Sequence, residues 1–94
     1  MDLIKVSATS RTSAVAGAIA GVVRDHQRAE VQAIGAGAVN QAVKALVLAT
    51  GFLREDGIHV YCVPEFIDVT IENNVRTAIK LVIEPRLSPA SAQD

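Results

Sequence analysis

The spacing of apolar residues changes period along this chain, and the order of those changes constrains the fold more than any other feature. Apolar and polar residues alternate over residues 2–7, which indicates a strand with one buried face. Apolar residues then recur at helical spacing over residues 13–28 and again over residues 38–50, with a short strand pattern at residues 30–34 between them. Strand patterns return from residue 58. The expected order is therefore strand, helix, strand, helix and then strands.

Residue types at the ends of the two helical segments predict where each helix begins and ends. Thr12 or Ser13 is the expected N-cap of the first helix, because a side-chain oxygen at that position accepts a backbone N–H. The sequence Gly35-Ala36-Gly37 leads into the second helix, and Gly51 is its expected C-terminal stop.

The same segments also predict which side of each helix faces the core. Gly17 and Gly21 are four residues apart in the first helix, which favours a close approach of another backbone along that stripe. In the second helix, Asn40 and Lys44 are expected to project together from one side. The residues expected to face inward in the second helix are Val39, Ala42, Val43, Leu46 and Val47.

The last third of the chain has the alternation of β-strands. Residues 58–63 are rich in strand-forming residues and are followed by Pro64, so a third strand is expected to end there. A hairpin is then expected, with apolar residues at Ile67, Val69, Ile71 and at Ile79, Leu81, Ile83 on the same side of it. Asn73-Asn74 is the expected turn.

These elements predict a two-layer α/β sandwich of order β-α-β-α-β-β, with both helices on one face of a mixed sheet. Residues 1–86 are expected to form a single domain, and residues 87–94, rich in Ser, Pro and Ala, a flexible C-terminal tail. Half of the 94 residues are hydrophobic, but only two Phe and one Tyr are aromatic, so the core must consist of Ala, Val, Ile and Leu. Because a core of that size is marginal alone, a homodimer or a dimer-based tetramer is expected to cover Leu48, Phe52 and Leu53.

Composition argues against several classes of protein. A net charge of -1 gives no overall basic field, so any site for a polyanion must be local. The longest stretch without a charged residue, residues 31–43, is too short to span a membrane, and the N-terminus lacks the pattern of a signal peptide. Cys62 is the only cysteine, so no internal disulfide forms. A cytoplasmic protein without membrane contact is expected.

The residues that carry chemistry in enzymes do not form a catalytic or metal-binding pattern here. His59 and Cys62 are three apart on one strand and should point to opposite faces, while His26 lies at the charged end of a helix. Gly35-Ala36-Gly37 begins like a dinucleotide-binding fingerprint, but Asn40 replaces its third glycine, and no Walker loop is present. We therefore expect no enzyme activity, no cofactor and no metal.

One edge of the predicted sheet is the best candidate for a site. If the first two strands are parallel, the segments 7–13 and 35–40 meet at their carboxyl ends, where backbone N–H groups and hydroxyls favour an anion. The alternative is that these residues are only helix caps and turn formers. The uncovered face should instead carry both charges, from Lys5, Lys80, Glu30, Asp68 and Glu72.

Four segments in order resemble the stage V sporulation protein S family: Lys5-Val-Ser-Ala, Val15-Ala-Gly-Ala-Ile-Ala-Gly21, residues 32–44 and Arg76-Thr-Ala-Ile79. The resemblance spans Leu3 to Pro85 and implies a bacterial cytoplasmic protein with a fold similar to Alba, whose members dimerise and bind DNA or RNA. It also implies a link to sporulation or cell development. The sequence departs from the family's pattern at Thr12-Ser13 and at the hairpin tip, residues 72–76.

Carried onto this sequence, the resemblance and the predicted edge together give the candidate nucleic-acid-binding residues Ser10, Arg11, Gly35, Gly37, Asn40, Gln41, Lys44 and Arg76. The expected partner is DNA or RNA, bound with weak sequence preference because the contacts are mostly to phosphate. Two other functions stay open from the sequence: an adaptor that binds proteins during sporulation, and a sensor of a small anion at the same edge.

Overall fold

The computed structural model describes residues 3–86, and its elements follow the predicted order. They are β1 (Leu3–Val6), α1 (Thr12–His26), β2 (Ala29–Ala33), α2 (Ala36–Glu55), β3 (Val60–Ile71) and β4 (Asn74–Pro85). The expected tail, residues 87–94, lies outside the described residues.

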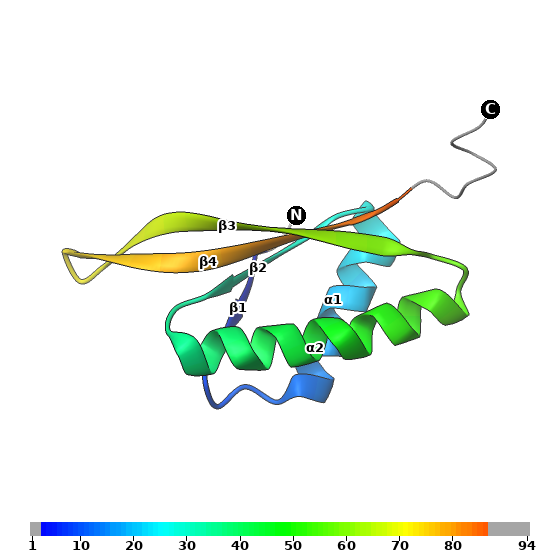
Figure 1. Cartoon of the computed structure of the whole chain (residues 1–94), viewed down its shortest axis with the longest axis horizontal. Coiled ribbons are helices and arrows are strands. Elements are labelled where there is room, and N and C mark those ends of the chain that lie inside the picture. Colours follow the sequence, from blue (N-terminus) through cyan, green and yellow to red (C-terminus); the bar gives the residue numbers. More distant parts are fainter. Residues whose placement is uncertain (1–2, 87–94) are drawn as a thin grey trace.

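The four strands form one mixed sheet in the order β1-β2-β4-β3. β1 is parallel to β2, and the pairs β2–β4 and β4–β3 are antiparallel. Both helices lie on the same face of this sheet (Figure 1). The predicted two-layer α/β sandwich is therefore confirmed.

The core between the layers is aliphatic, as the composition requires. Its largest fully buried side chains are Ile19, Leu53, Ile83, Val23 and Val31, contributed by both helices and by the two central strands. No aromatic side chain is buried among residues 3–86. Each of these aliphatic side chains contributes about 1.5–3 kcal/mol of hydrophobic stabilisation when fully buried.

Alanines, not valines, form the inward face of α2. The buried residues of this helix are Ala38, Ala42, Ala45, Ala49 and Leu53. The prediction that Val43 and Val47 face inward is wrong, since their side chains are 46% and 64% exposed. Because α1 also presents alanines, Ala16 and Ala20, the two helices meet through small side chains and the larger valines remain outside.

The two glycines of α1 do not have the predicted role. A Cβ atom added at Gly17 or Gly21 would meet nothing within 4 Å, so no backbone packs against them. The small residues that allow helix contact are the neighbouring alanines, one position away on the helix surface. The presence of glycine at these two positions is not explained by the structure.

α2 is longer than predicted and does not stop at Gly51. It starts at Ala36 and continues to Glu55, where the chain leaves the helix through Gly57 with φ of 76°. The left-handed backbone that ends a helix is therefore found at Gly57, and Gly51 is an ordinary position within the helix. α2 has 20 residues and contains an 18-residue window with a mean hydropathy of 1.3, so by length and composition alone it could span a membrane. Its alanine face, however, lies in the core of this domain.

The expected third strand and the first arm of the expected hairpin are one strand, β3. Pro64 lies inside it, paired with Leu81 of β4. A proline is tolerated there because β3 is an edge strand, and its other side needs no ladder hydrogen bond.

The two apolar sets of the hairpin face opposite sides of the sheet, which corrects the prediction. The turn consists of Glu72 and Asn73, both with positive φ, between the paired residues Ile71 and Asn74. A two-residue turn pairs odd-numbered with even-numbered residues, so Ile79 lies opposite Phe66, and Ala78 opposite Ile67. The hairpin tip extends well beyond β1 and β2 (Figure 1).

Candidate nucleic-acid interface

The loop between β1 and α1 is ordered by its own hydroxyl groups. The backbone N–H of Ser7 donates to Ser10 Oγ at 2.9 Å, and the N–H of Ser10 donates to the Ser7 carbonyl at 3.1 Å. Ser7 Oγ also lies 3.1 Å from Thr9 Oγ1. These bonds form a compact turn that delivers the chain into α1 at Thr12.

The first turns of α2 pack against this loop. Gln41 Nε2 donates to the Ser10 carbonyl oxygen at 2.8 Å. Gly37 is so close to the loop that an added Cβ would lie 2.9 Å from Ala8 Cβ, and Gly35 holds a φ of 90°. The loops that follow β1 and β2 therefore form one continuous edge, as the parallel strands predicted.

Both helices present free N-termini at this edge. The N-cap residues are Arg11 and Gly35, and neither helix has a side-chain capping bond. The expected caps Thr12 and Ser13 are wrong because both residues already lie in the first turn of α1. The backbone N–H groups of both first turns consequently lack intrahelical partners, which favours an anion in front of them.

Two of the predicted cations stand at or near these N-termini. Arg11 is the N-cap of α1, and Lys44 lies two turns into α2, one turn after Asn40. All three side chains are exposed, and neither cation is ion-paired within residues 3–86. Seven of the predicted residues, namely Ser10, Arg11, Gly35, Gly37, Asn40, Gln41 and Lys44, thus belong to the β1–α1 loop or to the start of α2.

Arg76 lies apart from these residues, on the projecting hairpin. It pairs with Val69, so both side chains are on the same face of the hairpin. Val69 lines a groove of about 380 Å³ together with Ser7 and Ala8 of the loop. Arg76 is therefore the neighbour, across the hairpin, of a residue that borders the same groove as the loop.

The groove contains polar residues that the sequence did not single out as a site. Lys5 and Gln32, paired on β1 and β2, line it with Thr70 of β3. The alternation of residues along β1 and β2 predicts that Lys5 and Gln32 lie on the open face of the sheet. It does not predict that the hairpin lies beside them, which is why the sequence did not indicate this groove. The candidate interface therefore consists of the loop edge and this adjoining groove.

Ion pairs neutralise the rest of the open sheet face. Glu30 accepts hydrogen bonds from Arg28 at 2.9 and 3.2 Å, and Lys80 Nζ lies 3.8 Å from Glu30 and 3.2 Å from Glu65. The hydrogen bond from Arg28 holds the pKa of Glu30 below its usual value, and the same bond raises the pKa of Arg28. The predicted mixed-charge face is present, but two of the predicted residues are not on it: Asp68 lies on the opposite face, level with Thr77, and Glu72 lies in the hairpin turn.

Of the side chains considered for catalysis, Cys62 is half-buried within β3 and His59 lies just before that strand. Burial raises the pKa of Cys62, which keeps it as a neutral thiol. Within residues 3–86, no group of three or more His, Cys, Asp or Glu residues is placed to hold a metal ion.

The architecture is that of an Alba-like α/β domain. Alba from Thermoplasma volcanium aligns over 92% of this chain and 100% of its own, with a TM-score of 0.56 and 12% sequence identity. Residues 2–86 match the family described as stage V sporulation protein S (SpoVS), and the chain belongs to that family.

Proposed function

We propose that this protein is a non-enzymatic, cytoplasmic regulator of sporulation or cell development that binds DNA or RNA. One observation carries the proposal: cations without an ion pair in the described part of the chain occur with two uncapped helix N-termini at one edge, whereas Arg28 and Lys80 at the open face are ion-paired. The family supports the link to sporulation, and the Alba-like fold supports nucleic-acid binding.

In this proposal, the loop edge contacts the phosphate backbone. Arg11 and Lys44 supply charge, the first-turn N–H groups donate hydrogen bonds to phosphate oxygens, and Asn40 adds a side-chain amide. Gln41 is already bonded to the Ser10 carbonyl and positions the loop. Arg76 and Lys5 extend the contact along the groove. Because these groups recognise phosphate rather than base edges, sequence preference is weak.

We also propose that two copies associate through the outer face of α2. This face exposes large apolar side chains at Val43, Val47, Leu48 and Phe52, and Phe66 of β3 is 78% exposed. Such a surface is costly to leave in water, and a second copy covers it in a homodimer or a dimer-based tetramer. Leu53, which the sequence also suggested as needing cover, is fully buried within the domain.

The same apolar face supports a second candidate function, an adaptor that binds another protein. The two functions differ in how much apolar surface stays exposed after self-association. A nucleic-acid binder covers the face with its own second copy, whereas an adaptor keeps a sizeable apolar patch exposed. A sensor of a small anion would use the same N–H groups at the loop edge, but its ligand would be a single small anion and not a nucleic acid.

A gel-shift titration with duplex DNA and with single-stranded RNA, at two salt concentrations, tests the proposal. Binding that weakens steeply as salt rises is the expected result, because a phosphate-backbone contact releases counterions. No shift with either nucleic acid at the lower salt concentration would contradict it. A shift that does not change with salt would instead favour contacts other than phosphate.

A further inference from the structure

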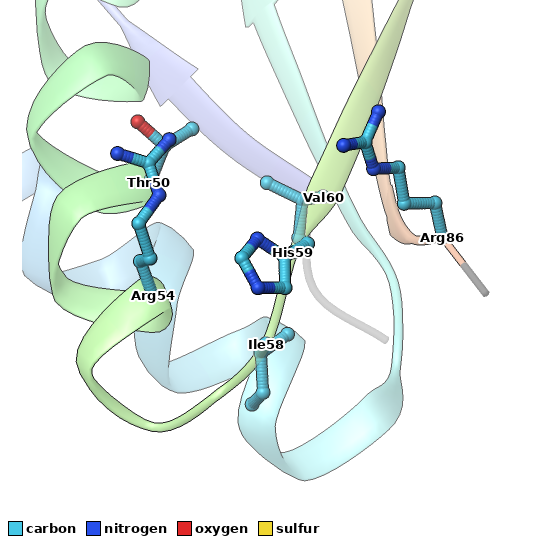
Figure 2. A pocket seen from close by; sticks show the side chains of 6 residues that line it. All are labelled: Thr50, Arg54, Ile58, His59, Val60 and Arg86. Atoms are coloured by element: carbon cyan, nitrogen blue, oxygen red, sulfur yellow. The ribbon is translucent and has the colours of Figure 1, made fainter. Parts of the chain in front are cut away.

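A second hollow lies at the other end of α2, away from the loop edge. It is about 250 Å³ in volume and sits where the last turns of α2 meet the start of β3 and the end of β4. The residues that line it are Thr50, Arg54, Ile58, His59, Val60 and Arg86 (Figure 2). Two guanidinium groups and an imidazole thus line a single pocket, and none of its lining residues is acidic.

The local fold holds these side chains in place from three segments. Arg54 extends along α2 beside Thr50, the ring of His59 is turned toward that helix, and Arg86 lies beyond Val60 at the end of β4 (Figure 2). The backbone N–H of Arg86 donates to the His59 carbonyl at 2.8 Å, which ties the two strand ends together. The pocket is therefore framed by hydrogen-bonded backbone.

The cations of this pocket are not used in ion pairs, unlike the other arginines nearby. Within residues 3–86, neither Arg54 nor Arg86 lies within ion-pair distance of a carboxylate. The neighbouring Asp56 is bonded to Arg24 at 2.7 Å. Glu84, close to Arg86 in sequence, lies 3.4 Å from Arg28. Asp56 and Glu84 are therefore already paired with arginines outside the pocket.

The C-terminal end of a helix disfavours an anion, because the carbonyl groups of its last turn carry partial negative charge. Hydrogen bonds to two of these carbonyl groups reduce this effect at the end of α2. The N–H groups of Asp56 and Ile58 donate to the Leu53 carbonyl at 3.0 and 2.9 Å, and Gly57 donates to the Arg54 carbonyl at 2.9 Å. These three donors satisfy two of the last-turn carbonyls, those of Leu53 and Arg54, and weaken their negative field. The two guanidinium charges therefore dominate.

We propose that this pocket binds the phosphate group of a small ligand, either inorganic phosphate or a phosphomonoester. Guanidinium groups match phosphate oxygens in pairs of hydrogen bonds, and an imidazole offers an N–H donor in every protonation state. The Thr50 hydroxyl already donates to the Val47 carbonyl at 2.6 Å, so the donors are Arg54, His59 and Arg86. A volume of about 250 Å³ is below that of pockets for whole drug-sized ligands, which suits a phosphate group with little attached.

The test is to titrate the protein with inorganic phosphate and, separately, with ribose 5-phosphate, and to monitor each titration by the amide signals in NMR spectra. Saturable shifts at the amides of Thr50, Arg54, His59 and Arg86 are the expected result with at least one of them. If both ligands bind, the pocket recognises the phosphate group whether it is free or part of a phosphomonoester. If only one of them binds, the pocket is specific for that form of phosphate. The absence of saturable shifts at these amides with both ligands would overturn the proposal.

Charge removal separates a built site from a general attraction of anions. Arg54→Gln and Arg86→Gln, made singly at exposed positions, should each weaken the binding roughly tenfold or more, as expected for loss of charge-assisted hydrogen bonds. The matched control is Arg76→Gln, which removes one exposed guanidinium that has no ion-pair partner within residues 3–86 and lies on the hairpin, not in the pocket. Unchanged affinity in both pocket variants, or an equal loss in the control, would contradict the proposal.

Discussion

At the scale of single residues, Gly37 has the most specific structural requirement. It lies in the first turn of α2 and touches the loop that follows β1, where an added Cβ would be 2.9 Å from Ala8 Cβ. The Cβ of Ala8 is attached directly to the backbone of a hydrogen-bonded loop, so no side-chain rotation can relieve the clash. The join between the two loops, and with it the candidate interface, depends on the missing side chain.

We expect Gly37→Ala to lower the free energy of unfolding by about 1–3 kcal/mol, because it overpacks this contact. The matched control is Gly51→Ala, where the added Cβ meets nothing within 4 Å and the helix gains roughly 0.5–1 kcal/mol from alanine. Urea unfolding followed by circular dichroism measures both. Equal effects of the two substitutions would show that the loops are not in close contact.

The Glu30 ion pair makes stability depend on pH. Its pKa is held below the usual value, mainly by the hydrogen bond from Arg28, so the charged form stabilises the folded state. This contribution is complete above the usual pKa of a glutamate and is lost as pH falls through the lowered pKa of the folded state. We expect Glu30→Gln to be less stable than wild type at neutral pH.

The difference in unfolding free energy between wild type and Glu30→Gln should shrink steadily as pH is lowered through the acid range. Thermal unfolding at a series of pH values measures it. A difference that stays constant with pH would show that the carboxylate is not stabilised by its partners. The effect should be small, because the pair is partly exposed and screened by salt.

At the scale of elements, the spacing of apolar residues predicted which helices and strands exist. It did not predict which face of each element points into the core. The spacing of apolar residues in α2 fits two neighbouring faces, one rich in valine and one rich in alanine. The sequence favours the valines as the more hydrophobic set, but contact with α1 selects the alanines, because close helix packing needs small side chains. This choice depends on a partner helix that local pattern cannot show.

Strand boundaries failed for a related reason. Pro64 looked like the end of a strand, yet it is accommodated because β3 lies at the sheet edge, a property of the whole sheet. The loop edge was predictable, since parallel strands place their following loops side by side. The groove and the pocket around Arg54 were not, because each joins segments that meet only through the long β3–β4 hairpin.

The alanine face of α2 gives a direct test of the observed helix orientation. Ala45 is fully buried in this face, and we expect Ala45→Leu to destabilise the protein by about 1–3 kcal/mol through overpacking. Ala18→Leu on the exposed side of α1 is the control, with an expected effect within about 0.5 kcal/mol. Chemical unfolding measures both. A tolerated leucine at position 45 would mean that α2 is turned differently.

At the scale of the whole molecule, a net charge of -1 conceals an uneven distribution. Carboxylates neutralise Arg28 and Lys80 at the open face, while within residues 3–86 cations without an ion pair occur at the start of α2 and, separately, at its end. Between them, the outer face of α2 is apolar. The helix thus separates two charged regions by a surface suited to a second copy.

We expect light scattering to give at least a dimer mass at micromolar concentration. Val47→Glu, at a position 64% exposed in the monomer, should shift the mass to that of a monomer without unfolding the domain. The reason is that a carboxylate in the centre of an apolar interface is desolvated without a partner. A monomer mass for the wild type would remove the proposed self-association.

Under the proposed function, the loop edge binds nucleic acid through phosphate contacts. The most direct measurement is the salt dependence of affinity for a fluorescent duplex, compared between two double variants. One is Arg11→Ala with Lys44→Ala at the loop edge, and the other is Arg54→Ala with Arg86→Ala at the opposite end of α2. Arg24 and Arg28 are poorer controls, because their removal would leave carboxylates unpaired.

Each cation lost from a phosphate contact lowers the slope of log affinity against log salt by roughly one unit. We expect the Arg11→Ala, Lys44→Ala variant to bind more weakly, with a slope reduced by about two. The Arg54→Ala, Arg86→Ala variant should keep the slope and affinity of the wild type. Equal losses in both variants, or no loss at the loop edge, would contradict the account.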